Sequence, residues 1–338
     1  MKNRKILCFL MSLLFLFALI IPCEAIQLKA GDSVLVGGVP FGVKFFSGSM
    51  TVSGFADVDG ENGSSSPAYE AGIREKDVIL KINGEKVKTA EEVTRTVEKS
   101  DGKTLDFLCN RNGKEISFDV IPIKSITSNT YKIGIWIKDS TSGIGTVTFI
   151  DKQSGFFGGL GHGICSNETG ELVPIRRGIV CNVTISGVEK GKVGTPGEIR
   201  GFFSGGKTGV VTVNCDCGVF GIFSTLTPNP KYCEPIEIGG RNEVQNGKAT
   251  ILCTLSENTV NEYGIEISKD STEENSKSFT VTVTDPKLLE ETGGIVQGMS
   301  GSPILQNGKL IGAITHVLVN DPAKGYGIYI ENMLEAAV

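Results

Sequence analysis

Short runs in which apolar and polar residues alternate recur through most of the chain after residue 130. Alternation with a period of two is typical of strands that bury one face. Glycine-containing turns separate these runs, and no long amphipathic helix lies between them, so the pattern predicts a closed or sandwiched all-β domain. The clearest runs are IGIWI at 133–137, GTVTFI at 145–150, GVVTVN at 209–214, ATILCTL at 249–255 and FTVTV at 279–283.

The region before residue 126 has a mixed α/β pattern. Val78–Ile82 predicts a strand that ends in the hairpin signal Asn83-Gly84. Thr89 to Glu92 has the form of a capping box and predicts a helix that continues to about Lys99. Two further strands are expected at 105–111 and 115–121, joined by the turn Asn112-Gly113.

Residues 67–87, PAYEAGIREKDVILKINGEKV, resemble the corresponding part of PDZ domains. The resemblance implies a small α/β peptide-binding domain, which we place at 30–125. The carboxylate-binding loop of PDZ domains has an apolar–glycine–apolar form, so Phe41, Gly42 and Val43 are expected to form it. The strand that follows would be the edge that a peptide joins. A small α/β domain without a ligand is the alternative.

The first 25 residues have the pattern of an export segment. Lys2, Arg4 and Lys5 precede an apolar stretch from Ile6 to Ile21, and PCEA follows at 22–25. This order is typical of a signal peptide cleaved after Ala25, while the apolar stretch is also close to the length of a membrane anchor. Both interpretations predict export of everything downstream.

Charge and composition exclude several classes of partner. The chain has 338 residues, which favours two domains, and a formal net charge of −5 without a basic patch, so no nucleic acid partner is expected. The segment GFFSGGKT at 201–208 matches a phosphate-loop string, but the β-branched run after it predicts a strand where that motif needs a helix. We therefore expect no nucleotide and no cofactor.

The cysteines point neither to a metal site nor to a disulfide framework. Nine are present, of which Cys8 and Cys23 lie in the export segment, so an odd number remains. No C-x-x-C pair or cysteine–histidine cluster indicates zinc. Buried free thiols are the favoured interpretation, and one or two disulfides the alternative.

The segment GGIVQGMSGSPI at 293–304 carries the strongest chemical signal. Trypsin-like proteases hold their nucleophile in a G-x-S-G-x-P stretch, and Gly298, Ser300, Gly301 and Pro303 reproduce that spacing. The N–H groups of Gly298 and Ser300 can then converge as an oxyanion hole. Ser300 is predicted to be the nucleophile, and Ser302 a structural serine.

A serine nucleophile needs a base, and the chain has two histidines. His162, in GGLGHGIC, has glycines on both sides and lies 138 residues before Ser300, which suits the base of a trypsin-like protease. His316 lies in an apolar strand, where a histidine is more often structural. For the group that orients the imidazole, the spacing leaves Asp216 and Asp285 open.

The export segment, the PDZ pattern, GLGHGI and the stretch TDPKLLEETGGIVQGMSGSPI together resemble the SpoIVB serine peptidase family of endospore-forming bacteria. The resemblance runs from about residue 30 to the C-terminus. It implies that His162 is the general base, Ser300 the nucleophile and Asp285 the orienting acid. It also implies a mainly β architecture: the PDZ domain, then a trypsin-like double β-barrel serine protease domain at 126–338.

The family resemblance further implies a signalling protease. Such a protein is exported across the forespore membrane into the space between two membranes and cleaves its own N-terminal segment. It then cleaves a membrane-bound regulatory protein, which leads to activation of a late sigma factor. Three alternatives stay open: an inactive PDZ adaptor, a quality-control protease of the HtrA kind, and Cys165 as a thiol nucleophile.

Overall fold

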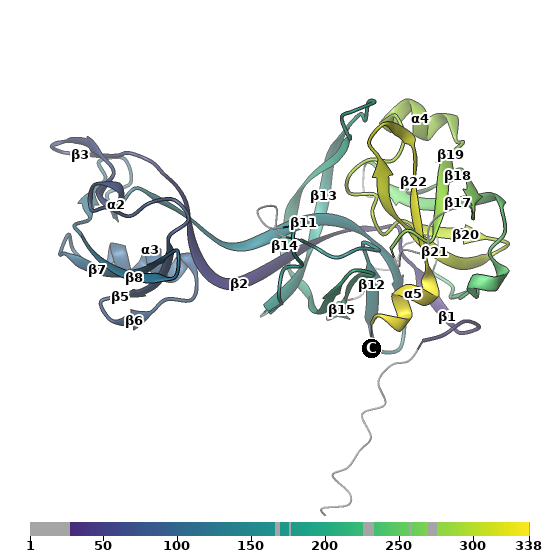
Figure 1. Cartoon of the computed structure of the whole chain (residues 1–338), viewed down its shortest axis with the longest axis horizontal. Coiled ribbons are helices and arrows are strands. Elements are labelled where there is room, and N and C mark those ends of the chain that lie inside the picture. Colours follow the sequence, from purple (N-terminus) through teal and green to yellow (C-terminus); the bar gives the residue numbers. More distant parts are fainter. Residues whose placement is uncertain are drawn as a thin grey trace, which may run out of the picture.

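The structure is a computed structural model that describes residues 28–165, 170–175, 177–225, 233–256, 259–269 and 276–337. It consists of two β-rich bodies joined by a long two-stranded ribbon (Figure 1). The export segment expected at 1–25 lies outside the described residues. Among the helices that are described, none combines the length and the apolar character needed to cross a membrane.

The first barrel belongs to the larger body and closes through the pairing of its first two strands. The ring runs β2–β13–β14–β15–β12–β11, and β11 pairs back onto β2. A short strand, β1 (Ser33–Val36), extends this sheet by pairing with β11 on one side and with β16 (Ile236–Glu237) on the other. The six strands of the ring are β2 (Pro40–Phe55), β11 (Ile135–Ile150), β12 (Phe156–Gly159), β13 (Arg177–Glu189), β14 (Glu198–Cys215) and β15 (Gly218–Phe223).

A second closed barrel follows in sequence and packs against the first, and its ring runs β17–β18–β19–β22–β21–β20. The two barrels confirm the predicted trypsin-like double β-barrel. The strands are β17 (Gly247–Thr254), β18 (Val260–Ser268), β19 (Phe279–Val283), β20 (Pro303–Gln306), β21 (Lys309–Leu318) and β22 (Asp321–Tyr329). The helical elements are η1 (Arg241–Glu243) before β17, α4 (Pro286–Thr292) between β19 and β20, and α5 (Ile330–Glu335) at the end.

The smaller body is the PDZ domain. Its helix cap and its hairpin turn form where the sequence predicted them. The Thr89 side chain accepts a hydrogen bond from the Glu92 amide and so caps α3. Asn83 and Gly84 both have positive φ, as a two-residue hairpin turn requires. The elements are β3 (Val58–Gly60), β4 (Gly63–Ser65), α2 (Pro67–Glu70), β5 (Val78–Ile82), β6 (Glu85–Lys86), α3 (Ala90–Glu98), β7 (Leu105–Arg111), β8 (Lys114–Val120), β9 (Ile123–Lys124) and β10 (Tyr131–Lys132).

The residues of the PDZ core are spaced as each element requires, every second residue on a strand and every fourth on the helix. Leu105, Phe107 and Cys109 alternate along β7 and are buried. Val93 and Val97, four residues apart on α3, pack into the same cluster. The domain therefore has an apolar core of its own, separate from those of the two barrels.

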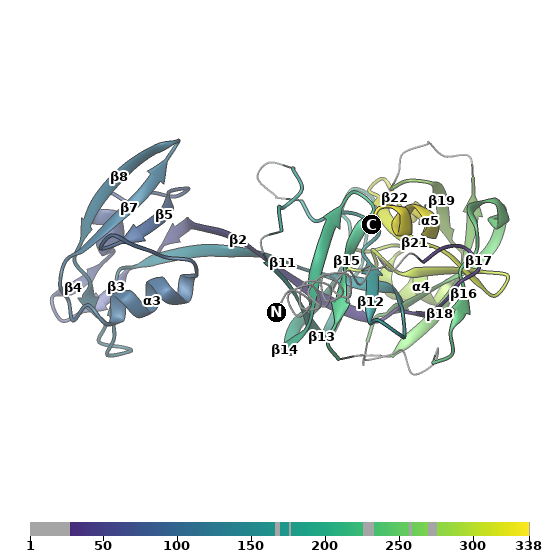
Figure 2. The ribbon, with the colours of Figure 1, turned by 90° about the horizontal axis from the view of Figure 1, so that it is seen from below.

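The PDZ domain is inserted into the first barrel rather than placed before it. The chain leaves the barrel along β2 and returns along β11, and these two strands form the ribbon (Figure 2). Residues 40–46 of β2 pair with 140–146 of β11 inside the barrel, whereas residues 51–55 pair with 135–138 beside the PDZ domain. The expected boundaries at 30–125 and 126–338 differ from this arrangement, because both connections are strands and neither is a linker.

Two further expectations can be compared with the fold. Residues 201–208 lie inside β14, and a strand continues after them as predicted. Cys109, Cys181, Cys217 and Cys253 are buried free thiols, as the favoured interpretation of the cysteines expected, whereas Cys165 and Cys233 are exposed and Cys215 is half-buried. Burial raises the pKa of the Cys109 thiol to about 12 and that of Cys217 to about 11, so both stay protonated at neutral pH.

Candidate active site

The loop between α4 and β20 contains Ser300 and is built on two glycines with left-handed backbone. Gly298 has φ 95° and Gly301 has φ 92°, a region that disfavours side chains. A Cβ at position 301 would lie 2.0 Å from the Thr146 carbonyl oxygen, and one at 298 would lie 3.0 Å from the Ile199 Cβ. The tight approach of this loop to the first barrel therefore requires glycine at both positions.

The two predicted oxyanion-hole donors, Gly298 and Ser300, lie in this loop with their N–H groups available. The carbonyl of Gln297 accepts a 2.8 Å hydrogen bond from the Ile199 amide in β14. Since C=O and N–H point in opposite directions across a trans peptide, this bond directs the Gly298 N–H away from β14. Neither the Gly298 nor the Ser300 N–H donates to another described residue. The loop can thus present both donors to a substrate carbonyl.

The Ser300 side chain is half-buried and points toward β21. Its hydroxyl donates a 2.7 Å hydrogen bond to the carbonyl of Thr315. Ser302, the serine expected to be structural, is fully buried. Ser300 is therefore the serine of this loop that a substrate can reach.

His162 lies on the loop after β12 and is half-buried at the junction of the barrels. Its Nδ1 is 2.9 Å from the carbonyl oxygen of Gly163. Because a carbonyl can only accept, Nδ1 carries the proton and Nε2 keeps its lone pair. Burial holds the pKa of His162 below its ordinary value, with the Gly163 carbonyl acting in the opposite direction. The imidazole is thus neutral at pH 7 and can accept a proton at Nε2.

Neighbouring backbone brings the His162 loop beside Ser300. A Cβ on Gly161 would lie 2.9 Å from the Thr315 Cγ2, so the residue before His162 contacts the residue that holds the Ser300 hydroxyl. No hydrogen bond joins His162 and Ser300 directly in the described structure. The hydroxyl has to turn from the Thr315 carbonyl to reach the imidazole, a rearrangement that is common when substrate binds.

Asp285, the acid that the family resemblance implies, has other partners. Its carboxylate accepts hydrogen bonds from the Lys287, Leu288 and Gly264 amides, so it caps α4 and ties that helix to β18. These contacts do not favour an orienting role, which stays a prediction.

The other sequence candidate for the acid, Asp216, lies in the exposed turn between β14 and β15. Neither Asp216 nor Asp285 is among the groups that shift the pKa of His162. The Gly163 carbonyl instead sets the tautomer of the imidazole. In the described structure, the Ser300 hydroxyl and the His162 imidazole are therefore both held by backbone carbonyls.

His316, expected to be structural, lies in contact with His162, the predicted base. The centroids of the His162 and His316 rings are 4.9 Å apart, with an angle of 36° between their planes. The sequence contained a signal for this contact, because His316 follows Ser300 by sixteen residues and lies in the strand next to it. The site thus contains both histidines of the chain.

Phe41, Gly42 and Val43 do not form a peptide-binding loop, which corrects the sequence prediction. They lie in the barrel half of β2, where Gly42 is level with Ile144 on one side and Cys181 on the other. The side chains of Phe41 and Val43 are buried in the core of the first barrel. Because both edges of the strand are already paired here, no peptide can add to it.

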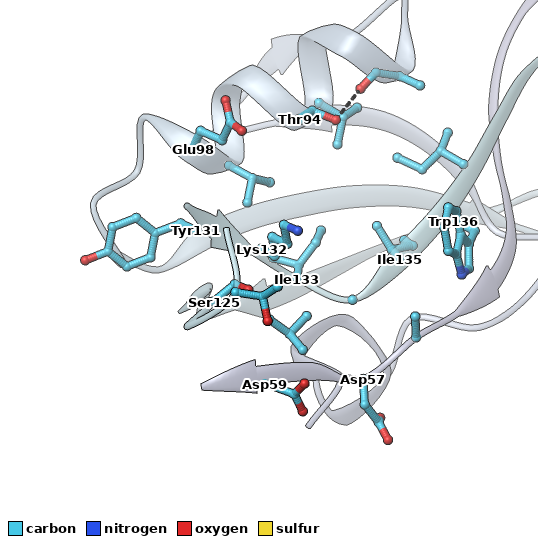
Figure 3. Close-up of a pocket in the computed structure, with 18 residues that line it drawn as sticks. Asp57, Asp59, Thr94, Glu98, Ser125, Tyr131, Lys132, Ile133, Ile135 and Trp136 are labelled. Atoms are coloured by element: carbon cyan, nitrogen blue, oxygen red, sulfur yellow. Dashed lines mark hydrogen bonds between the residues drawn. The ribbon is translucent and has the colours of Figure 1, made fainter. Parts of the chain in front are cut away.

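A groove on the PDZ domain fits the peptide-binding role better (Figure 3). It has a volume of about 580 Å³ and lies between α3 and residues 132–137. Ile133, Gly134 and Ile135 supply the apolar–glycine–apolar pattern, which the sequence analysis assigned to a strand. The Ile133 and Gly134 carbonyls accept bonds from the Ala68 and Ala56 amides. The N–H groups of Gly134 and Ile135 therefore face away from the domain core.

A second cavity adjoins the catalytic loop itself. It has a volume of about 360 Å³, and Gly298 forms part of its wall. Apolar side chains of Ile144, Ile199 and Phe203 line it, and Gln297 and Glu198 are also part of the lining. A substrate residue near the scissile bond has room in this cavity.

Two family models match the chain. One, described as SpoIVB peptidase S55, matches residues 129–334, and one described as a PDZ domain matches residues 62–121. Among curated proteins, the chain is similar to the probable protease eep of Enterococcus faecalis, with 42% identity over 72 residues, 21% of this chain and 17% of that protein. It is also similar to the zinc metalloprotease RasP of Geobacillus kaustophilus, with 34% identity over 92 residues, 27% of this chain and 22% of that protein. The chain thus spans about a fifth of the length of these relatives.

The solved structures that match this chain share little sequence identity with it. The active form of the Rv3671c protease from M. tuberculosis has 12% identity and a TM-score of 0.34, with 58% of this chain and 73% of that chain covered. The HtrA-type protease AlgW with a decapeptide has 13% identity and a TM-score of 0.34, with 59% of this chain and 52% of that chain covered.

Proposed function

The chain belongs to the SpoIVB peptidase S55 family, whose members are serine endopeptidases, and we propose that it works as an exported, self-cleaving signalling protease of endospore formation. Its target is a membrane-associated regulatory protein between the forespore and the mother cell, and cleavage of that protein leads to activation of a late sigma factor. The export pattern of residues 1–25 supports the location. The PDZ groove supports a protein substrate with an extended segment.

The chemistry proceeds from the arrangement of the catalytic loop. The Ser300 Oγ attacks the scissile carbonyl carbon while Nε2 of His162 takes the hydroxyl proton. The carbonyl oxygen becomes an oxyanion between the N–H groups of Gly298 and Ser300. The imidazolium then protonates the leaving amine as the peptide C–N bond breaks. Water, deprotonated by the same imidazole, hydrolyses the acyl ester and returns Ser300 to its hydroxyl form.

One observation carries this proposal. Ser300 lies two residues after Gly298, in a loop where the N–H groups of these two residues make no bond to the described protein, and the loop of His162 packs beside it. Such an arrangement leaves two N–H donors without a protein acceptor, and a substrate carbonyl oxygen can fill that place.

The test compares the wild-type protein with Ser300→Ala. We expect wild type to react with a fluorophosphonate, which requires an activated serine, and to lose its N-terminal segment when purified. Ser300→Ala should do neither, with a loss of about 10⁶-fold in cleavage rate. The intact masses of both proteins, from a protease-deficient host, report the trimming directly.

Two outcomes would contradict the proposal. Trimming of Ser300→Ala at the same position would remove self-cleavage from it. Wild type that neither labels nor cleaves a fluorescent casein would favour the alternative in which the protein is an inactive PDZ adaptor.

A further inference from the structure

Thr146, in β11, lies where the first barrel meets the catalytic loop. The residue is only 2% exposed. Its hydroxyl donates a 2.8 Å hydrogen bond to the Gly298 carbonyl, and its amide donates a 2.9 Å bond to the Ser300 carbonyl. One residue of the first barrel therefore holds both residues of the proposed oxyanion hole, which belong to the second.

These bonds fix the peptide planes on either side of the Ser300 N–H. That donor belongs to the peptide between Met299 and Ser300. The Gly298 carbonyl precedes this peptide and the Ser300 carbonyl follows it, and Thr146 anchors both. With both neighbouring peptides held, the intervening peptide can turn only about the axis that joins the Met299 and Ser300 Cα atoms, so the loop keeps its place around the Ser300 N–H. Because oxyanion stabilisation depends on donors that are already oriented, this anchoring bears on the transition state more than on substrate binding.

Thr146 also contacts the loop of the general base. Its carbonyl accepts a 3.2 Å hydrogen bond from the Leu160 amide, two residues before His162. The three hydrogen bonds of Thr146 thus reach the nucleophile loop twice and the base loop once. Thr146 therefore connects the loop of Ser300 to the loop of His162 and helps to fix their relative position.

We propose that Thr146 is a positioning residue that holds the oxyanion loop in its reactive form through its hydroxyl. The proposal rests on Ser300 being the nucleophile, as proposed above. Two of the three bonds are made by the backbone of Thr146 and persist when its side chain is replaced by valine, serine or cysteine, so the hydroxyl bond to Gly298 is the part that a side-chain variant changes. Thr148, two residues along β11, donates in the same way to the Gly301 carbonyl and adds support on the far side of Ser300.

The chain offers a matched control in Thr254. This residue is also 2% exposed, and its hydroxyl also donates across the barrels, at 2.9 Å to the Gly38 carbonyl. Gly38 is not part of the catalytic loop. Thr146→Val and Thr254→Val therefore remove the same kind of buried hydrogen bond, and both should lower thermal stability.

The decisive measurements are kcat and KM on a fluorogenic peptide taken from a casein site that wild type cleaves, and the affinity of a peptide aldehyde. Thr146→Val should lower kcat about tenfold to a hundredfold with KM within twofold, since loss of a whole oxyanion donor costs about 10²–10³. Aldehyde affinity should fall by the same factor. Thr146→Ser, which retains the hydroxyl, should recover most of both, and Thr254→Val should leave both unchanged.

The inference is overturned if Thr146→Val keeps wild-type kcat and aldehyde affinity while Ser300→Ala is inactive. It is also overturned if Thr254→Val loses as much kcat, because the effect would then be one of stability alone. Should Thr146→Val fail to fold, Thr146→Cys carries the same expectation, since a thiol of similar size donates only weakly. Activity in Ser300→Ala would instead refute the proposed function and leave the anchoring of this loop a separate question.

Discussion

At the residue scale, a backbone carbonyl takes over one of the two roles that a carboxylate has in a catalytic triad. In a triad, the acid both fixes the tautomer of the histidine and stabilises the imidazolium that forms. Here the Gly163 carbonyl fixes the tautomer of His162, and the carboxylate of Asp285 caps α4. A neutral carbonyl stabilises an imidazolium less than a carboxylate does, so catalysis by Ser300 and His162 would depend more on the proposed oxyanion hole.

Substitutions of Asp285 distinguish a cap from a catalytic acid. Asparagine caps a helix about as well as aspartate, whereas alanine costs about 1 kcal/mol. We therefore expect Asp285→Asn to label with a fluorophosphonate at a rate within about twofold of wild type. Asp285→Ala should also stay active but unfold at lower urea concentration.

A true orienting acid would behave differently. The Asn variant would then lose about 10⁴-fold in rate with its stability unchanged, as the corresponding change does in a triad. His162→Ala, which removes the base, serves as the control for complete loss. Labelling rates and urea midpoints are compared for wild type, the two Asp285 variants and His162→Ala. A 10⁴-fold loss of labelling rate in Asp285→Asn would support the family-based assignment.

At the element scale, a buried ion pair connects the turn before β5 to the end of β7 in the PDZ domain. Arg111 donates to both carboxylate oxygens of Asp77, at 2.7 and 2.6 Å, and also to the Gly72 carbonyl. Asp77 is 1% exposed. Burial raises the pKa of Asp77, but the hydrogen bonds from Arg111 and the Arg74 amide outweigh it, so the net pKa lies below the ordinary value of 3.8.

The sign of this shift predicts how stability depends on pH. A carboxyl whose folded-state pKa is lowered contributes stability above its ordinary pKa, and the contribution is lost as pH falls through the folded-state value. Asp77→Asn should therefore cost about 3 kcal/mol at pH 7, because it leaves Arg111 without its charged partner. The deficit relative to wild type should shrink as pH falls below about 4.

Trp136 makes the measurement specific, because it is the one tryptophan of the chain and lies at the PDZ groove. Its fluorescence in urea reports unfolding of this domain at each pH. Glu91→Gln, which removes the exposed pair with Arg95, is the control and should change stability by less than about 0.5 kcal/mol. A constant deficit of Asp77→Asn from pH 7 to pH 3 would show that the Asp77 charge contributes nothing.

The elements that the sequence predicted well are those specified by neighbouring residues. The Thr89 cap, the Asn83-Gly84 turn and the alternating strands each depend on a few consecutive positions. The double barrel followed from the same alternation together with the family resemblance. The spacing of glycines around Ser300 is local as well, and it predicted the tight loop that the structure shows at 298–301.

What the sequence did not predict depends on pairing between distant segments. An apolar–glycine–apolar triplet occurs at 41–43 and again at 133–135, and nothing local distinguishes them. Only the pairing of β2 with both β11 and β13 buries the first and leaves the second beside α3. The contact between His162 and His316, 154 positions apart, is likewise a property of the closed barrels.

At the scale of the whole molecule, the insertion of the PDZ domain means that the protease domain needs segments from both sides of it in the sequence. Phe41, Val43 and Phe45 of β2 are buried in the first barrel, although they precede the PDZ domain in sequence. Pairs from Phe46 with Ser140 to Pro40 with Thr146 close the barrel. The protease domain is therefore discontinuous, and β11 connects the PDZ groove at one end to Thr146 at the other.

Two truncated proteins test this architecture against a contiguous one. In the first, residues 47–139 are replaced by Asn-Gly, which can join Phe46 to Ser140 as a two-residue hairpin. This protein should fold and label with a fluorophosphonate at a rate within about threefold of the full chain. The second is the fragment 126–338, which lacks three buried aromatic or aliphatic side chains of β2 at about 2–5 kcal/mol each. It also exposes open strand edges, so it should be insoluble or unlabelled.

Solubility, size-exclusion profile and labelling rate compare the two proteins, with Ser300→Ala in the first as the control for specific labelling. A soluble, monomeric and reactive 126–338 fragment would show that β1 and β2 are dispensable, and the first barrel would then have to close without them. Failure of both proteins to fold would show that the PDZ domain itself stabilises the barrel through the ribbon. Only folding of the hairpin-joined protein, together with failure of the fragment, agrees with an insertion between β2 and β11.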